Sequence, residues 1–284
     1  MNRNTSIEVH GHRGCAGPMP ENTIPAFLRA MELGCDWIEM DVVITGDGQV
    51  LVSHETWMDA SICRKPDRTI LTEKEGRSIN IFTLSLAEVQ AYFCAPSTVD
   101  VEPAHWEDDW HKPTLAEVVR ATDRFSRERG SAPVKFNIEI KSEPDLYGTY
   151  QPLPKPFAVR VLAEIDALHI ADRCLVQCFD VVVLEAVHSI APEMPVALLV
   201  ENTEGLESNL QRISFMPSYY SPEFHLVNED LVRTLRDKGI GLLGWTVNGS
   251  EDIRRMIALG LDGIITDHPE RAVAQERSGT IFTS

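Results

Sequence analysis

The chain has 284 residues, of which 43% are hydrophobic and 24% charged, with a formal net charge of −17 at pH 7. This composition is that of a folded globular protein, and the length fits one large domain or two smaller ones. The negative charge argues against nucleic acid or an anionic membrane surface as the main partner, because both would be repelled. An anionic substrate would need local attraction from a bound cation or an arginine in a cleft.

The six cysteines are scattered and form no CxxC pair. Cys174 and Cys178, if they lie on one strand, are about 13 Å apart, which is too far for a disulfide. We therefore predict reduced thiols and a cytoplasmic protein. Because the opening residues lack the apolar run of a signal peptide and no later run could span a bilayer, membrane insertion is not expected.

Apolar periodicity alternates between the patterns of strands and helices along most of the chain. The predicted strands are residues 7–9, 37–41, 135–140, 175–179 and 196–200, a segment near Tyr219, and residues 242–247 and 263–266. The main predicted helices are residues 24–33, 115–127, 157–168, 182–190, 206–213, 228–238 and 250–259, the first capped by Asn22 or Thr23 and ended by Gly34. Eight strand-helix units favour a (β/α)8 TIM barrel over an open doubly wound sheet.

Two stretches depart from this alternation. Asp47-Gly48 predicts a hairpin turn between residues 42–45 and 49–53. Residues 55–113 are irregular and acidic, and we interpret them as an insertion or lid inside a single domain of residues 1–284. We expect a short helix at residues 86–93 of this insertion, but no convincing core of its own.

Residues able to do chemistry occur where predicted strands end, and the carboxyl ends of barrel strands are where active sites form. Side chains two apart leave the same face of a strand, so the members of each close pair should point together. The residues are His12 after the first strand, Glu39 and Asp41 at the second, His54 after the hairpin, and Glu139 and Lys141 at the third.

Two carboxylates in one dry cavity would repel each other unless a cation lay between them. Oxygen ligands without cysteine predict Mg²⁺ or Ca²⁺, with Glu39, Asp41 and Glu139 as protein ligands. The alternative is that Glu39 and Asp41 face solvent at a sheet edge. The apolar residues on both sides of Glu139 argue against that alternative.

His12 and His54 suit acid-base work because neutral and protonated imidazole coexist near neutral pH. The planar guanidinium of Arg13 matches phosphate oxygens. A packed histidine and a surface arginine are the ordinary alternatives. His10 shares a strand face with His12, so this pair could instead bind zinc.

The sequence resembles the glycerophosphodiester phosphodiesterase family. GHRG, PENTIPAF, WIEMDV and GDGQVLVSHE match the opening signature of that family in order, and FNIEIK, GWTVN and DGIITDHP are similar to its later blocks. The resemblance covers nearly the whole chain. It implies a TIM barrel that uses a divalent metal to hydrolyse glycerophosphodiesters to glycerol 3-phosphate and an alcohol.

The resemblance also implies roles for particular residues. It implies that His12 and His54 are the acid-base pair and that the nucleophile is either water or the glycerol 2-hydroxyl. Arg13 and Lys141 would contact the phosphate, Glu39, Asp41 and Glu139 would bind the metal, and Trp245 would either wall the substrate pocket or pack in the barrel. Glu55 stands where the family usually has aspartate, and residues 56–61 lack its usual arginine, so recognition of the alcohol or glycerol is harder to predict than catalysis.

Two alternatives remain at this stage. One is a metal-dependent amidohydrolase in which His10 and His12 bind zinc and Asp267 is the base. The remaining histidines are poorly placed for that site. The other is a barrel that binds a ligand or partner without catalysis. The sequence does not predict the oligomeric state.

Overall fold

The computed structural model describes residues 7–94 and 110–279. Nine strands form its main sheet: β1 (Glu8–Gly11), β2 (Trp37–Ile44), β3 (Val50–Val52), β6 (Lys135–Ile140), β7 (Cys174–Cys178), β8 (Val196–Val200), β9 (Tyr219–Pro222), β10 (Gly241–Gly244) and β11 (Gly263–Thr266). Their order is β1-β11-β10-β9-β8-β7-β6-β2-β3, and β1 also pairs with β2, which closes the sheet. Only β3, the second arm of the predicted hairpin, is antiparallel to its neighbour. The predicted TIM barrel is confirmed.

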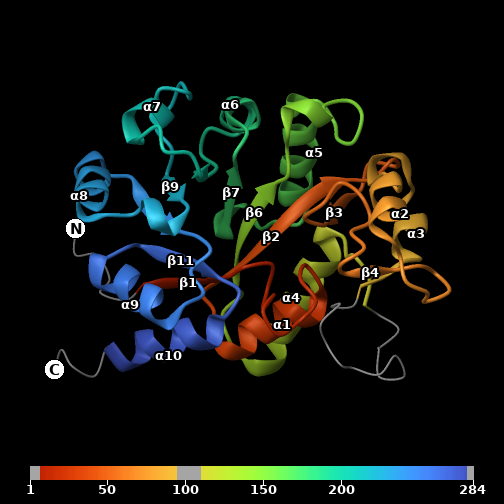
Figure 1. Ribbon diagram of the computed structural model, residues 1–284, viewed down its shortest axis with the longest axis horizontal. Helices are drawn as coiled ribbons and strands as arrows, with labels where there is room; N and C mark the ends of the chain where they lie inside the picture. The colour runs from red at the N-terminus through yellow and green to blue at the C-terminus, as the bar shows by residue number, and fades with distance from the viewer. Residues whose placement is uncertain (1–6, 95–109, 280–284) are drawn as a thin grey trace.

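Helices follow the barrel strands and surround them (Figure 1). They are α1 (Ile24–Leu33), α4 (Leu115–Arg129), α5 (Pro154–Ala167), α6 (Val181–Ile190), α7 (Leu206–Leu210), α8 (Glu229–Lys238), α9 (Ser250–Leu259) and α10 (Pro269–Gly279). The Thr23 hydroxyl caps α1, and Gly34 ends it with a φ of 94° that suits glycine. Asn22 is not the cap, because its side chain is hydrogen-bonded to Asp41.

The main core lies between the barrel and its helices. Phe27 of α1, Phe136 and Ile138 of β6, and Phe157 of α5 are fully buried there. Along β2, apolar Ile38 and Met40 face this layer while the alternate residues point into the barrel. Side-chain alternation therefore directs the polar residues of β2 and β6 toward the barrel axis.

The insertion folds against the hairpin. Within the described residues it contains α2 (Glu73–Ser78), α3 (Leu86–Gln90), and the paired strands β4 (Cys63–Arg64) and β5 (Phe93–Cys94). The predicted helix at 86–93 ends early, at Gln90, and Phe93 begins β5. Residues 95–109 of the predicted insertion lie outside the described residues.

The expectation that the insertion lacks its own core is wrong. Met58, Leu71 and Ile81 are at most 2% exposed and form a second hydrophobic cluster. This cluster includes Val43 and Leu51 of the hairpin, so the insertion is anchored directly on β2 and β3. The sequence pattern hid this core because its members are spread singly among polar residues.

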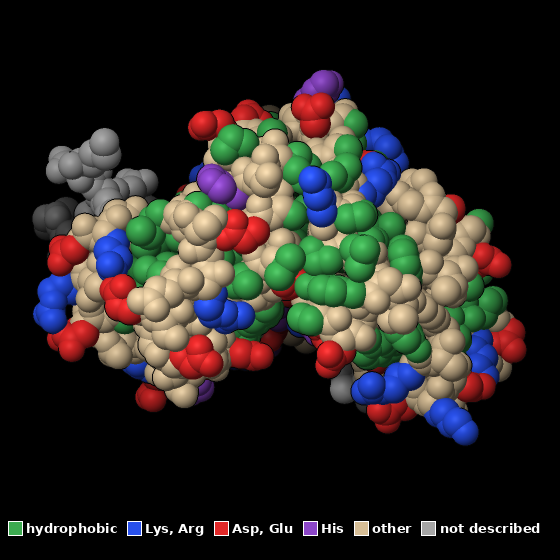
Figure 2. Space-filling view, turned by 90° about the horizontal axis from the view of Figure 1, so that it is seen from above, with side chains coloured by type: hydrophobic (Ala, Val, Ile, Leu, Met, Phe, Trp, Pro, Cys, Tyr) green, Lys and Arg blue, Asp and Glu red, His purple; other side chains and the backbone are tan. Residues whose placement is uncertain are grey.

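All six cysteines lie in the described ranges, and all are free thiols, as predicted. No helix within residues 7–94 and 110–279 is both long and apolar enough to cross a membrane. On the face shown in Figure 2, basic side chains lie scattered among acidic ones, and hydrophobic side chains gather near its middle.

Candidate active site

A cavity of about 390 Å³ opens where the barrel strands end. Seven of the eight predicted site residues line it: His12, Arg13, Glu39, His54, Glu139, Lys141 and Trp245. The eighth, Asp41, is 1% exposed and lies 3.2 Å from the Arg13 side chain. The structure therefore brings together residues that are spread over more than two hundred positions of the sequence.

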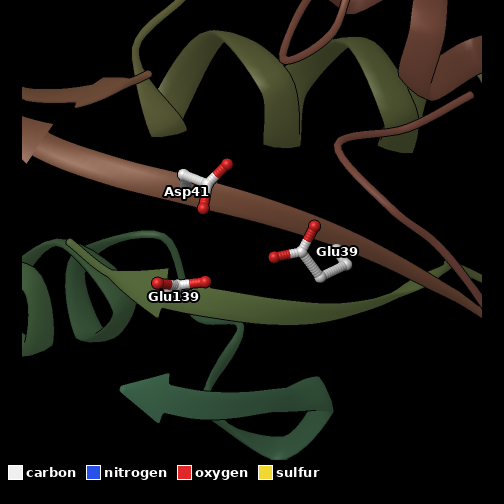
Figure 3. A group of neighbouring side chains, drawn as sticks. All are labelled: Glu39, Asp41 and Glu139. Carbon is white, nitrogen blue, oxygen red and sulfur yellow. The ribbon is translucent and has the colours of Figure 1, made fainter. Parts of the chain in front are cut away.

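The register of the sheet gathers three carboxyl groups. Asp41 of β2 is the direct partner of Glu139 on β6, and Glu39 lies two residues before Asp41 on the same face. Oxygen atoms of Glu39, Asp41 and Glu139 lie within 4.8 Å of one another, and the three residues are at most 8% exposed. Figure 3 shows these carboxyl groups together between the two strands.

Burial and mutual repulsion act on these acids. Burial, reinforced by Asp41 and Glu139, raises the pKa of Glu39 well above its ordinary value. The pKa of Glu139 is also raised, by burial and by Asp41, although Lys141 opposes the shift. For Asp41 burial alone would raise the pKa, but Arg13 and Lys141 outweigh burial and lower it.

These three carboxyl groups could hold a metal ion. Oδ1 of Asp41 is buried and has no hydrogen-bond partner among the described residues, and the Lys141 ammonium lies 3.8 Å from it, so this oxygen could coordinate a metal. A divalent cation would relieve the repulsion that raises the pKa of Glu39 and Glu139. Carboxylate oxygens are the ligands that Mg²⁺ and Ca²⁺ prefer.

Arg13 is held at the entry to α1 through both its backbone and its side chain. Its backbone N–H donates to Glu39 Oε2 at 2.8 Å, and its guanidinium donates to both carboxylate oxygens of Glu21, at 3.0 and 2.9 Å. The φ of Arg13 is 48°, and Gly14 follows with a φ of 89°, so the backbone turns tightly between β1 and α1. Glu21, which lies in the PENTIPAF block, was not predicted to belong to the site.

Each of the two predicted histidines is paired with a carboxylate through Nδ1. His12 lies 2.6 Å from Asp267, and His54 lies 2.8 Å from Glu55. The other oxygen of Asp267 accepts a hydrogen bond of 2.6 Å from Asn248. Although burial would raise the pKa of Asp267, its hydrogen bond with His12 lowers it. Glu55, the departure from the family pattern, thus still reaches the neighbouring histidine.

His10 does not line this cavity. It is 1% exposed and stacks on Trp37 with ring centroids 5.1 Å apart. Burial and the nearby Lys135 lower the pKa of His10 to about 3. Among the described residues, the three carboxyl groups form the one cluster of three or more metal-ligating side chains, so this part of the structure offers no support for a zinc site at His10.

A chain of buried amides connects His10 to the acidic cluster. Asn137 lies 3.4 Å from Nδ1 of His10 and donates to Gln177 at 3.0 Å. Gln177 in turn donates to Glu39 at 3.0 Å. Neither amide was predicted, because an asparagine or glutamine inside a strand gives no local sign of what it faces.

Lys141 and Trp245 are the remaining predicted residues that line the cavity. The Lys141 ammonium donates to Glu139 at 2.7 Å and lies 3.8 Å from Asp41. The Trp245 indole N–H donates to the carbonyl of Ser221 at 2.7 Å. Trp245 thus both packs at the barrel rim and lines the cavity.

Comparison with known proteins identifies the family of this chain. The model of the glycerophosphoryl diester phosphodiesterase family matches residues 12–271. Glycerophosphodiester phosphodiesterase of Caldanaerobacter subterraneus is 31% identical over 95% of this chain and 98% of its own, and the enzyme of that name from Bacillus subtilis is 26% identical over 91% and 83%.

Solved structures are also similar to this chain over nearly its whole length. A Silicibacter pomeroyi protein assigned to this family has a TM-score of 0.81 and 28% identity over 96% of this chain and 94% of its own. A glycerophosphodiester phosphodiesterase from Parabacteroides distasonis, 20% identical, shares the fold with a TM-score of 0.72 over 97% of this chain and 98% of its own. The chain therefore belongs to the glycerophosphoryl diester phosphodiesterase family, which confirms the prediction of an enzyme of this family.

Proposed function

We propose that this protein is a metal-dependent phosphodiesterase that hydrolyses glycerophosphodiesters to glycerol 3-phosphate and an alcohol. The observation that carries the proposal is one cavity that combines a cluster of three carboxyl groups with two carboxylate-paired histidines and an arginine. Family membership and the 31% identical relative support the reaction class.

Glu39, Asp41 and Glu139 would hold one divalent cation, Mg²⁺ or Ca²⁺. A bound cation of this kind neutralises negative charge on a phosphoryl group as the transition state forms. Arg13 and Lys141 line the same cavity and would add positive charge at the phosphate. The net charge of −17 is thereby offset where the anionic substrate binds.

His12 and His54 would act as the acid-base pair. Because Nδ1 of each ring faces a carboxylate, Nε2 is the atom left to exchange a proton with the substrate. One histidine takes the proton of the nucleophile, which is water or the glycerol 2-hydroxyl, and the other protonates the leaving alcohol. Asp267 and Glu55 stabilise the positive charge on each ring while it holds the extra proton.

A coupled assay for glycerol 3-phosphate tests the proposal. Choline, ethanolamine, glycerol and inositol diesters should be supplied with Mg²⁺ or Ca²⁺, and then with a chelator. We expect release from at least one diester, loss of release with the chelator, and recovery on adding metal. No release from any diester with either metal would contradict catalysis and favour a barrel that only binds a ligand.

A further inference from the structure

We propose that the half of the cavity facing away from His12 and His54 receives the alcohol of the substrate and selects a cationic amino alcohol. This inference rests on the proposed function and narrows its substrate class. It is carried by two aromatic and two acidic side chains that line the same cavity: Phe179, Trp245, Glu143 and Glu201.

These four side chains follow four different barrel strands, and of these β8, which Glu201 follows, lies directly across the barrel from β1. Glu143 comes after β6, Phe179 after β7, Glu201 after β8 and Trp245 after β10. His12 follows β1, and in the closed sheet β8 is four strands away from β1 on either side. A diester whose phosphate lies beside Arg13 therefore has one arm free to extend toward this second half.

The aromatic part of this wall is fixed in place. The rings of Phe179 and Trp245 meet edge to face, with centroids 5.4 Å apart and planes at 88°. The hydrogen bond from the Trp245 indole to Ser221 prevents the larger ring from turning. Two perpendicular rings present an aromatic face together with an apolar edge, which suits the methyl or methylene groups around an ammonium.

The acidic part of the wall has no partner of its own. The side chains of Glu143 and Glu201 are exposed at the cavity and make no hydrogen bond or ion pair within the described ranges. The backbone of Glu143 is nevertheless held on both sides by buried Gln151, whose amide bonds its N–H and its carbonyl at 3.1 Å each. The loop therefore holds the backbone of Glu143 in place beside the cavity.

Within the described residues, no basic side chain forms an ion pair with either acid. The lysine and arginine that line the cavity are Lys141 and Arg13, and their nearest acids are Glu139 and Glu21. The second half of the cavity is thus acidic and aromatic. It attracts an ammonium group and repels an anionic head group over the short range that salt leaves unscreened.

The test compares two substrates of nearly equal shape. Glycerophosphocholine carries a quaternary ammonium, and the 3,3-dimethylbutyl diester replaces its nitrogen with carbon. We expect wild-type kcat/KM to favour the choline diester by about tenfold, the size of a cation–aromatic contact helped by exposed carboxylates. In the double variant Glu143→Gln, Glu201→Gln this ratio should fall to about two or three, because only the choline diester has an ammonium group for the carboxylates to attract.

Glu193→Gln is the matched control. Glu193 is an exposed acid before the start of β8, at the opposite end of the strand that Glu201 follows, and it does not line the cavity. This change should leave the ratio at its wild-type value. A wild-type ratio near one, or an unchanged ratio in the double variant, overturns the inference.

Equal losses on both substrates in the double variant would also overturn it, because the carboxylates would then bind the glycerol hydroxyls. Failure to hydrolyse either diester would instead refute the proposed function itself. The two failures are therefore distinguishable.

Discussion

Nδ1 of His12 lies 2.6 Å from Oδ1 of Asp267, although 255 residues separate them in the chain. Closure of the barrel produces this contact, because β1 pairs with β11 and places Gly11 opposite Thr266. His12 directly follows β1, and Asp267 directly follows β11. The first and last strands thus build one half of the proposed acid-base pair.

Asp267→Asn should lower kcat by about tenfold or more, because an amide cannot stabilise the protonated His12 ring as a carboxylate does. His12→Ala should cost about a hundredfold or more. In the double variant the Asp267→Asn change should cost little beyond His12→Ala, because Asp267 acts through that ring. Steady-state kinetics of the three variants measure these changes in kcat. Fully additive losses would show that Asp267 acts independently.

Glu39→Ala should abolish binding of Mg²⁺ or Ca²⁺, measured by calorimetry on protein stripped of metal. The variant loses one of three clustered carboxyl groups. His54→Ala is the control, since it should bind metal as the wild type does while turnover falls about a hundredfold. Normal metal affinity in Glu39→Ala would rule out the proposed cation site.

The sequence predicts most of this architecture because the barrel repeats a local pattern. Each strand-helix unit carries its own periodicity, and the site residues lie in the strands or directly after them. Glu39 and Glu139 lie within β2 and β6, and His12 directly follows β1. Their proximity follows from the fold alone, and the resemblance to a family adds the proposed roles.

What the sequence does not predict depends on contacts between distant residues. The approach of Asp267 to His12 and of Gln177 to Glu39 depends on which side chains meet across the barrel. The core of the insertion likewise forms from single apolar residues, such as Ile81, that have no helical or strand periodicity. No local pattern marks any of these contacts.

His10 should make metal-free protein sensitive to acid. Burial and Lys135 lower its pKa from 6.5 to about 3, so between these values the unfolded state binds the proton that the folded state does not. The contribution of neutral His10 is complete above pH 6.5 and is lost as the pH falls toward the folded pKa. By about pH 4.5 the loss is about 2–3 kcal/mol.

Chemical denaturation with a chelator present, in wild type and His10→Gln, measures this effect. The variant should lose less unfolding free energy between pH 6.5 and about pH 4.5. Other titrating groups are common to both proteins and cancel in the comparison. Parallel pH profiles would contradict the burial of a neutral His10.

Ile81→Ala should destabilise the insertion and the hairpin beneath it by about 2–5 kcal/mol, because it leaves a cavity in the second hydrophobic cluster. Ile70→Ala is the matched control in the same insertion. Ile70 is 72% exposed, so its truncation should change the free energy of unfolding by at most about 0.5 kcal/mol. Equal effects in thermal or denaturant unfolding would show that the insertion has no core.

The most direct test of the central claim is ³¹P NMR of glycerophosphocholine incubated with the metal-loaded wild type and with the His12→Ala and His54→Ala variants. We predict that the wild type converts the diester signal to that of glycerol 3-phosphate. Each variant should do so at least about a hundredfold more slowly. Phosphocholine as the product, or undiminished conversion by either variant, would contradict the account.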